Sequence, residues 1–330
     1  MLQCSTPTQC DPPAFANIYP RVTRAAHRLG VADPLTGAIG ELFQSTFTRP
    51  ARDPAYRTNQ LQPGALPLEW SFSEGEPDAL RIELQPFDPE MRSQDRLQYA
   101  IEELFSLVTL YYGKELATQF EKTVTRGVIA PLERMNFGAF LGLVLKPNVV
   151  PKLKIYVEVD PESRSGSWDV VSSLTGVVPH FRSVAIGEFG IAERFYYLCT
   201  EVFRLLDLEA LCNALGMPHH FPRLLMTLLD LTEGEFYLLP RSVLVGIRTG
   251  LQGPELKIEL VSTLAMSPDG LKERIERRLR PDSIKPFRRW SRVVCPRSPS
   301  ALPISMVSVK ISANKPARLN LYVAEPWSES

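Results

Sequence analysis

Three short stretches of the sequence place a tyrosine a few residues after a cation, within an alternating polar and apolar pattern. The pairs are Lys154 with Tyr156, Arg194 with Tyr196, and Arg318 with Tyr322. Cations that converge from different strands can bind a multiply charged phosphate group. The face of a tyrosine ring attracts a positive charge by about 2 kcal/mol where water is excluded. These residue types therefore predict phosphate chemistry that depends on a few placed charges.

Glu69 is a further candidate for chemistry, because it lies in a strand that otherwise alternates between polar and apolar residues. The stretch "PLEWSFSEGEPDALRIELQP" spans residues 67–86 and places Glu69 and its hairpin partner Arg81 on a face that looks protected. A carboxylate there could accept a hydrogen bond or a proton. The alternative is a charge on an exposed sheet edge. Trp70 points to the opposite face by parity and is expected in the core.

Pairs of short alternating runs, separated by turn residues, recur five times along the chain and predict five hairpins. They span 68–73 with 80–85, 140–146 with 152–159, 182–189 with 193–201, 243–250 with 255–262, and 304–312 with 318–325. Helical spacing predicts helices between and before them. These stretches are 22–29, 35–47, 96–124, 201–216, 219–232 and 267–279. Hairpins are antiparallel, which excludes a doubly wound parallel sheet.

Parity in the second strand of each hairpin separates an apolar face from a polar one. On the polar face, each hairpin provides a cation that could bind phosphate, and these five are Arg81, Lys154, Arg194, Lys257 and Arg318. Ten strands with one apolar face can close into a barrel whose apolar face is covered by helices outside. The polar, tyrosine-rich face would then line a wide lumen. The alternative is a two-layer α/β sandwich whose polar face lies in solvent.

Composition narrows the class of protein. The chain has 330 residues, with 37 basic and 37 acidic side chains, and a nucleic-acid binder would normally show a basic excess. The basic stretch 285–292, "KPFRRWSR", is interpreted as a solvated loop rather than an RNA contact. No apolar run approaches the ~20 residues of a membrane span, and no signal peptide is visible.

The cysteines and histidines give no sign of a structural metal or of disulfides. Five cysteines are scattered without CxxC spacing, at Cys4, Cys10, Cys199, Cys212 and Cys295. We interpret them as reduced thiols and predict a cytoplasmic protein. Neither an HExxH motif nor a Cys/His ligand cluster occurs, so no zinc site is expected. No DDxxD motif is present to hold magnesium.

The hairpins resemble those of the aromatic prenyltransferases with the ABBA barrel, in the branch of the dimethylallyltryptophan synthases and bacterial or cyanobacterial indole prenyltransferases. The matching stretches are "PLEWS", "LRIELQP", "KIY" at Lys154–Tyr156 and "RLNLYVAEP". Each motif is short, and the order and spacing of the five hairpins is the stronger signal. The resemblance implies an α+β fold of ten antiparallel strands in a central barrel, surrounded by a ring of helices. We expect one domain over 1–330, with a helical segment over 1–60 and five repeats over 61–326.

The resemblance also implies an activity, namely transfer of an allylic isoprenyl group from its diphosphate to an indole-type acceptor through a carbocation. The donor would be dimethylallyl or geranyl diphosphate. Glu69 would be catalytic, hydrogen-bonding the indole N–H or accepting the released proton. The diphosphate would be bound by Arg81, Lys154, Arg194, Lys257 and Arg318, and the carbocation would be shielded by Tyr156, Tyr196 and Tyr322.

No cofactor is expected to be required, and magnesium would at most stimulate by binding the diphosphate itself. The partners would be small molecules, with no nucleic acid and no membrane. Glu259 departs from the family pattern, which tends to have tyrosine at that position. Alternatives are the same fold acting on a phenol or a peptide side chain, or a non-catalytic barrel that binds an amphipathic small molecule.

Overall fold

The computed structural model describes residues 11–31, 37–126, 130–163, 166–249, 253–295 and 302–325. Cys4, Cys10 and residues 250–252 of the predicted fourth hairpin turn lie outside the described residues. That residues 1–330 form one domain stays a prediction.

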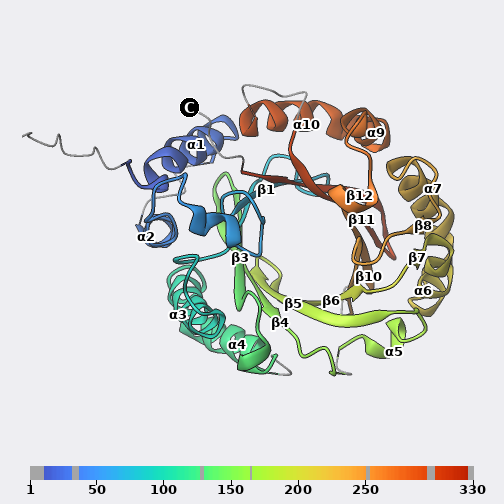
Figure 1. The fold of residues 1–330 in the computed structure, drawn as a ribbon, viewed down its shortest axis with the longest axis horizontal. Coiled ribbons are helices and arrows are strands. Elements are labelled where there is room, and N and C mark those ends of the chain that lie inside the picture. Colours follow the sequence, from blue (N-terminus) through green and yellow to red (C-terminus); the bar gives the residue numbers. More distant parts are fainter. Residues whose placement is uncertain are drawn as a thin grey trace, which may run out of the picture.

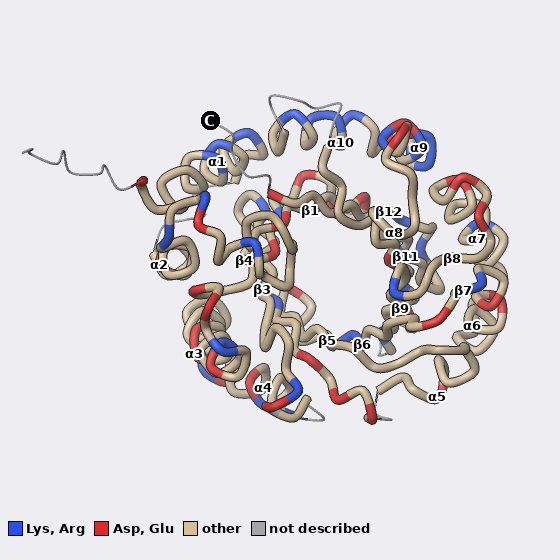
Figure 2. The backbone as a smooth tube through the Cα atoms, viewed as in Figure 1, with Lys and Arg blue, Asp and Glu red and all other residues tan. Residues whose placement is uncertain are grey.

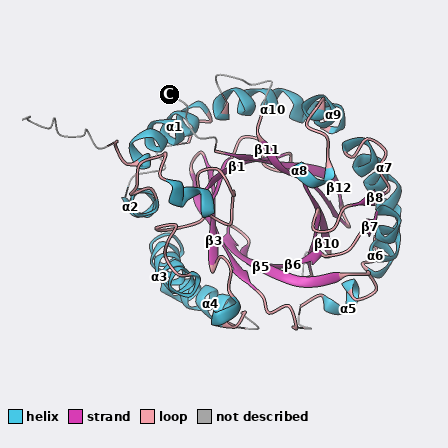
Figure 3. Cartoon of the chain, viewed as in Figure 1, coloured by secondary structure: helices cyan, strands magenta, loops and turns pink. Residues whose placement is uncertain are grey.

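Ten strands form a closed antiparallel barrel at the centre of the molecule (Figures 1 and 3). They are β1 Leu68–Ser73, β2 Leu80–Leu84, β3 Ala139–Lys146, β4 Val149–Glu158, β5 Val177–Gly187, β6 Gly190–Cys199, β9 Val243–Arg248, β10 Glu255–Val261, β11 Ile304–Ser312 and β12 Lys315–Ala324. Consecutive strands pair as the five predicted hairpins, and β12 pairs with β1 to close the barrel. The predicted barrel is thus confirmed, and the sandwich alternative is wrong.

A ring of helices surrounds the barrel, as Figure 3 shows. The helices are α1 Ala14–Arg28, α2 Gly37–Thr46, α3 Ser93–Tyr112, α4 Lys114–Thr125, α5 Trp168–Val171, α6 Leu208–Ala214, α7 Phe221–Leu231, α8 Ser262–Ala265, α9 Leu271–Arg278 and α10 Pro281–Val294. Short 3-10 turns are η1 Pro54–Thr58, η2 Leu132–Arg134, η3 Leu205–Asp207 and η4 Pro218–His220, and a separate two-stranded sheet pairs β7 Phe203–Arg204 with β8 Tyr237–Leu238. None of the described helices combines the length and apolar character that crossing a membrane requires.

The apolar face of each strand packs outward against the helices, as parity predicts. Trp70 and Phe72 of β1 are each 1% exposed. The ring of Phe72 lies 5.5 Å from Phe287 and 5.7 Å from Trp290, both on α10. Burying a side chain of this size contributes roughly 3 kcal/mol. This aromatic contact fixes α10 to the strand that carries Glu69, and it confirms Trp70 as a core residue.

Three sequence predictions differ from the structure in their local detail. The stretch 96–124 forms two helices, because Gly113 adopts a φ of 86° between α3 and α4. The stretch 201–216 begins as β7 and a 3-10 turn, and is α-helical only over α6. The stretch 285–292 is not a loop, since it lies within α10, where Phe287 and Trp290 are buried three residues apart on one helix face.

The two ends of the barrel differ because every strand pair turns at the same end. The hairpin turns lie between β1 and β2, β3 and β4, β5 and β6, β9 and β10, and β11 and β12. The longer connections that contain the helices join the strands at the opposite end. A side chain near a hairpin turn therefore lies at one end of the lumen, and one near a helical connection lies at the other.

Candidate active site

The polar face of the barrel points into the lumen, because side chains on strands that are not neighbours meet there. Ser305 of β11 donates a hydrogen bond of 2.6 Å to Glu69 of β1, although β12 lies between them. The lumen-facing residues fall into two groups. The first, which we call the cationic end, lies near the hairpin turns and contains Arg81, Lys146, Lys152, Arg194, Arg248, Lys310 and Arg318, with Glu76 and Glu255. The second, the tyrosine–carboxylate end, contains Glu69, Glu83, Lys154, Tyr156, Tyr196, Lys257, Glu259 and Tyr322.

Glu255 is the centre of the cationic end. Its carboxylate accepts from Arg194 at 2.7 Å, from Arg248 at 2.8 Å and from Lys310 at 2.6 Å. Burial alone would raise the pKa of Glu255, but Arg194, Lys310 and Arg248 outweigh it and lower the pKa to about 2. Burial, together with the charge of Arg194, lowers the pKa of Lys310 to about 6 even though Glu255 opposes the shift. The positive charges here exceed what one carboxylate can neutralise.

Further cations complete this end from the other side of the lumen. Arg81 and Lys146 share Glu76, at 2.5 and 2.7 Å. The side chains of Lys152 and Arg318 have no ion pair or hydrogen bond with any residue that the structure describes, and burial and the charge of Arg81 lower the pKa of Lys152. Figure 2 shows Lys and Arg positions on the barrel strands as well as on the outer helices. The cationic end can thus receive an anion with several charges.

One lysine, one tyrosine and one carboxylate form a linked group at the tyrosine–carboxylate end. The Tyr156 hydroxyl donates to Glu83 at 2.6 Å, and Lys154 lies 3.3 Å from the same carboxylate. The Lys154 ammonium also contacts the Tyr156 hydroxyl and lies 4.5 Å from the centre of its ring. Burial raises the pKa of Glu83, but Lys154 and the Tyr156 hydroxyl outweigh it and the net pKa is lowered. Glu83 therefore stays ionised and fixes both partners.

A second group with the same three residue types involves β10 and β12. Lys257 donates to the Tyr322 hydroxyl at 2.6 Å and forms an ion pair with Glu259, and all three residues are buried. Burial lowers the pKa of Lys257, but Glu259, Tyr196 and Tyr322 outweigh it and the net pKa is raised. Glu259, the departure noted in the sequence, thus serves here as the counter-ion of a fully buried lysine.

Tyr196 lies between these two groups. Its ring stacks on Phe181 at 4.5 Å, and the Lys257 ammonium lies 5.7 Å from its centre. Gly246 on the neighbouring strand makes room for the ring, since a Cβ there would lie 2.9 Å from a Tyr196 ring carbon. The Tyr156 ring centre is 6.3 Å from that of Tyr196. Two tyrosine faces and one phenylalanine therefore line a common part of the lumen.

Glu69 differs from the other carboxylates of the lumen, because its hydrogen-bond donors among the described residues are neutral. Its partners are Gln62 and Ser305, and its side chain is 2% exposed. Burial raises the pKa of Glu69 well above its ordinary value, and the nearby charges of Glu83 and Glu259 raise it further. Burial thus favours the protonated form of Glu69 to a higher pH than is usual for a carboxyl group, and such a shift suits a general acid or base.

The residues near the cationic end do not fit a protein-bound divalent metal. Magnesium prefers carboxylate and water oxygens, whereas both carboxylates here, Glu76 and Glu255, are already bound by cations. Within the described ranges, no group of three or more His, Cys, Asp or Glu side chains is arranged to hold a metal ion.

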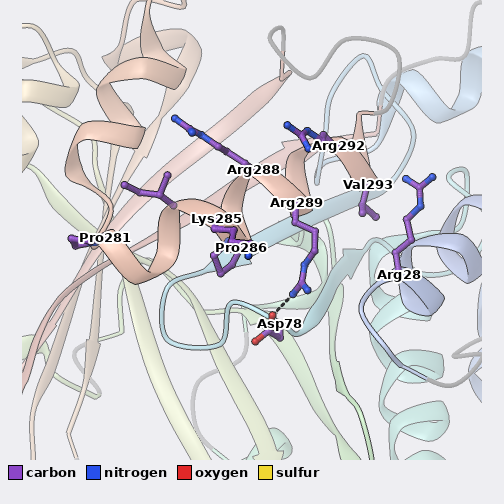
Figure 4. Close-up of a pocket in the computed structure, with 10 residues that line it drawn as sticks. Arg28, Asp78, Pro281, Lys285, Pro286, Arg288, Arg289, Arg292 and Val293 are labelled. Carbon is purple, nitrogen blue, oxygen red and sulfur yellow. Dashed lines mark hydrogen bonds and ion pairs between the residues drawn. The ribbon is translucent and has the colours of Figure 1, made fainter.

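Two cavities differ in their relation to these residues. One of about 800 Å³ opens beside the hairpin turns and is lined by Lys152 and Arg248 among others, so it leads to the cationic end. The other, of about 810 Å³, is a groove on the outer surface beside α10. Figure 4 shows Arg28, Lys285, Arg288, Arg289 and Arg292 around it, with Arg289 bound to Asp78. It does not contact the lumen residues described above.

The structure brings all nine sequence-predicted site residues to the lumen face. Eight further cations or carboxylates of these two groups were not among the predicted site residues: Glu76, Glu83, Lys146, Lys152, Arg248, Glu255, Glu259 and Lys310. Lys152 and Glu255 share the parity of Lys154 and Lys257, which is a signal that could have identified them. Lys310 and Arg248 lie on the first strands of hairpins, where the alternation of polar and apolar residues gives the same signal.

The ten-stranded antiparallel barrel within a ring of helices is the ABBA-type barrel of prenyltransferases, as predicted. No protein-family model matches the chain, and neither does any curated protein. Among solved structures, the binary complex of prenyltransferase PriB with product diphosphate has a TM-score of 0.74 at 15% identity, covering 95% of this chain and 96% of that one. The 5-dimethylallyltryptophan synthase from Streptomyces coelicolor has a TM-score of 0.72 at 14% identity, covering 97% and 99%. NotF in complex with brevianamide F and DMSPP has a TM-score of 0.59 at 14% identity, covering 99% and 98%.

Proposed function

We propose that the protein is an aromatic prenyltransferase that transfers a dimethylallyl group from its diphosphate to an indole-type acceptor. The observation that carries this proposal is that the two ends of the barrel lumen carry different kinds of side chain. Cations gather at the end near the hairpin turns, and buried tyrosines gather at the other end with Glu69, a carboxyl group whose pKa is raised by burial. Fold likeness adds support, since two of the similar structures are a 5-dimethylallyltryptophan synthase and NotF bound to brevianamide F and DMSPP.

In the proposed reaction, the bond between the allylic carbon and the diphosphate oxygen breaks, and its electron pair leaves with the diphosphate. Arg81, Lys152, Arg194, Arg248 and Arg318 would neutralise the charge that develops on the leaving group. Lys154 and Lys257 extend this set toward the tyrosines. Because most of these cations come from different strands, the diphosphate would be held from several directions.

The allylic cation would lie between the faces of Tyr156, Tyr196 and Tyr322, which attract positive charge without forming a bond to it. A carbon of the indole ring attacks the cation, and a proton then leaves that carbon to restore aromaticity. Glu69 in its ionised form would accept this proton, or would orient the ring by accepting a hydrogen bond from the indole N–H. The closed barrel limits the access of water to the cation.

The alternatives named from the sequence are less well supported. Known similar structures contain tryptophan or brevianamide F, which favours an indole acceptor over a phenol or a peptide side chain. A non-catalytic barrel would have no use for so many cations at one end. The proposal extends to a role in indole alkaloid biosynthesis, with geranyl diphosphate as a second donor to test and with no required metal. Cysteines 199, 212 and 295 are free thiols, which supports a cytoplasmic location.

The proposal is tested by incubating the purified full chain with a panel of indoles and with dimethylallyl or geranyl diphosphate, with and without magnesium. Mass spectrometry should detect an acceptor that has gained one isoprenyl unit. Product formed without added magnesium, and in the presence of a chelator, is the expected result. Absence of product with every acceptor and both donors, from folded protein, would contradict the proposed activity.

A further inference from the structure

Glu255 occupies the position where the cationic end has the most convergent donors. Its Oε2 accepts from Arg194 on β6 and from Arg248 on β9, and its Oε1 accepts from Lys310 on β11. The four strands β11, β10, β9 and β6 are consecutive in the barrel wall. Both carboxylate oxygens are therefore used, and the side chain is only 4% exposed.

This arrangement leaves positive charge without enough compensation. In the strand register, Lys310 is paired with Lys257 on one side and with Arg318 on the other. Like charges directly opposite each other on neighbouring strands are destabilising. The lowered pKa of Lys310, which follows from burial and from Arg194, reflects the same excess of positive charge. An anion with more charge than a carboxylate would match this end of the lumen better than Glu255 does.

We propose that Glu255 is an internal counter-anion that a bound diphosphate displaces from Arg194, Arg248 and Lys310, and that it thereby weakens donor binding and speeds diphosphate release. This inference rests on the proposed function, which supplies diphosphate as the anion. A carboxylate attached to the barrel competes at a high effective concentration. It would hold the cations in place before the donor arrives and recover them once the reaction is complete.

A proton should accompany this exchange. The charged groups that face Lys310 are Glu255 and Lys257 on β10, Arg194 on β6, Arg248 on β9 and Arg318 on β12. When a diphosphate replaces the single charge of Glu255, the ammonium form of Lys310 becomes more favourable. Binding near pH 7.5 should therefore take up a proton from the solution.

The test is isothermal titration of inorganic pyrophosphate into the full-length protein, its Glu255→Gln variant and a Glu276→Gln control. Glu276 lies on α9 and pairs with Arg288 on the outer surface, 2.6 Å away, so its loss also removes one negative charge. We expect Glu255→Gln to bind pyrophosphate at least tenfold more tightly and to release it more slowly, and the control to match the parent. Equal or weaker binding by Glu255→Gln would overturn the inference.

Two further measurements keep the test decisive if Glu255→Gln does not fold. Titration of the unmodified protein in two buffers of different ionisation enthalpy should show proton uptake, and its absence would overturn the inference. The Glu255→Asp variant, whose carboxylate is drawn back by one methylene, should bind pyrophosphate with intermediate affinity. If no variant binds pyrophosphate at all, the donor site and the proposed function fail. If binding occurs but does not depend on residue 255, only this inference fails.

Discussion

Lys257 on β10 donates a hydrogen bond of 2.6 Å to the hydroxyl of Tyr322 on β12, although β11 lies between the two strands. Such a contact is possible because the sheet curves into a barrel and both side chains point inward. The ammonium also lies 5.0 Å from the centre of the Tyr322 ring and 5.7 Å from that of Tyr196. One lysine thus fixes two of the tyrosines proposed to shield a cation.

Substitution of Glu69 should separate catalysis from folding. We expect Glu69→Gln to lower turnover by about 100-fold or more, as for loss of a general base. Stability should be retained, because the amide can still hydrogen-bond Gln62 and Ser305. Product formation by mass spectrometry and urea unfolding would be measured together, with Glu276→Gln as the control. Unchanged turnover would remove Glu69 from the mechanism.

The activity should rise with pH over a range set by Glu69. Its pKa is raised by burial and by Glu83 and Glu259, so the ionised form needed to accept a proton appears only above the ordinary range of a carboxyl. The initial rate of the unmodified protein should follow this rise, measured with saturating donor. The rate of the Glu69→Gln variant should not show this rise with pH. If the rise persists in the variant, it is due to another titrating group.

Stability should depend on pH in the opposite direction. Because the folded-state pKa of Glu69 lies above the unfolded value of 4.5, the folded form binds the extra proton. The stabilisation by the protonated carboxyl is complete below the unfolded pKa and is lost as pH rises through the folded pKa. The free energy of unfolding of Glu69→Gln relative to the parent should therefore increase from pH 5 to pH 8. A constant difference in urea unfolding would contradict this.

Gly246→Ala should disturb the position of Tyr196. The added Cβ would lie 2.9 Å from a ring carbon of Tyr196, closer than van der Waals contact allows. We expect a several-fold loss of turnover and more hydrolysis of the donor, because the shield over the cation shifts. Gly142→Ala on β3 is the matched variant, since its new Cβ would meet its nearest neighbour, Lys154, at 3.4 Å. Equal effects of the two variants would contradict a specific role of the space beside Tyr196.

Trp290 should contribute to stability but not to chemistry. It is fully buried against Phe72 and Phe287, and its indole nitrogen has no hydrogen-bond partner among the described residues. Trp290→Ala should lower the free energy of unfolding by about 3–5 kcal/mol. Trp290→Phe should cost less than Trp70→Phe, because Trp70 donates a hydrogen bond of 2.6 Å to Glu325 that phenylalanine cannot replace. Chemical denaturation of the three variants would check this order.

The barrel could be predicted from the sequence because apolar residues alternate with polar ones along its strands. Alternation in β2, β4 and β10 assigns Arg81, Lys154 and Lys257 to one face without any knowledge of the neighbouring strands. Helix boundaries were predicted less well where a local signal was hidden. Gly113 ends one helix within a continuous helical pattern. In α10, the many basic residues are typical of a solvated loop and mask the helical spacing of Phe287 and Trp290.

The sequence does not predict which side chains contact one another in the lumen, because these contacts depend on how neighbouring strands are shifted relative to each other. Parity places Glu255 and Lys310 on the same face, but it does not show that Arg194 and Arg248 also converge on that carboxylate. Likewise, the neutral environment of Glu69 follows from Gln62 and Ser305, which come from a loop and from a strand 236 positions away. The roles of the site residues in catalysis stay predictions.

The seam between β1 and β12 has a consequence for how the protein is made. It pairs Glu69 with Ala324, so the barrel wall becomes continuous only when the last strand has paired with the first. Each hairpin can form locally as the nascent chain emerges, whereas such distant pairing is slow. Glu69 meets Ser305, and Lys257 meets Tyr322, only after nearly the whole chain has been synthesised. Activity should therefore be among the last properties that a newly synthesised molecule acquires.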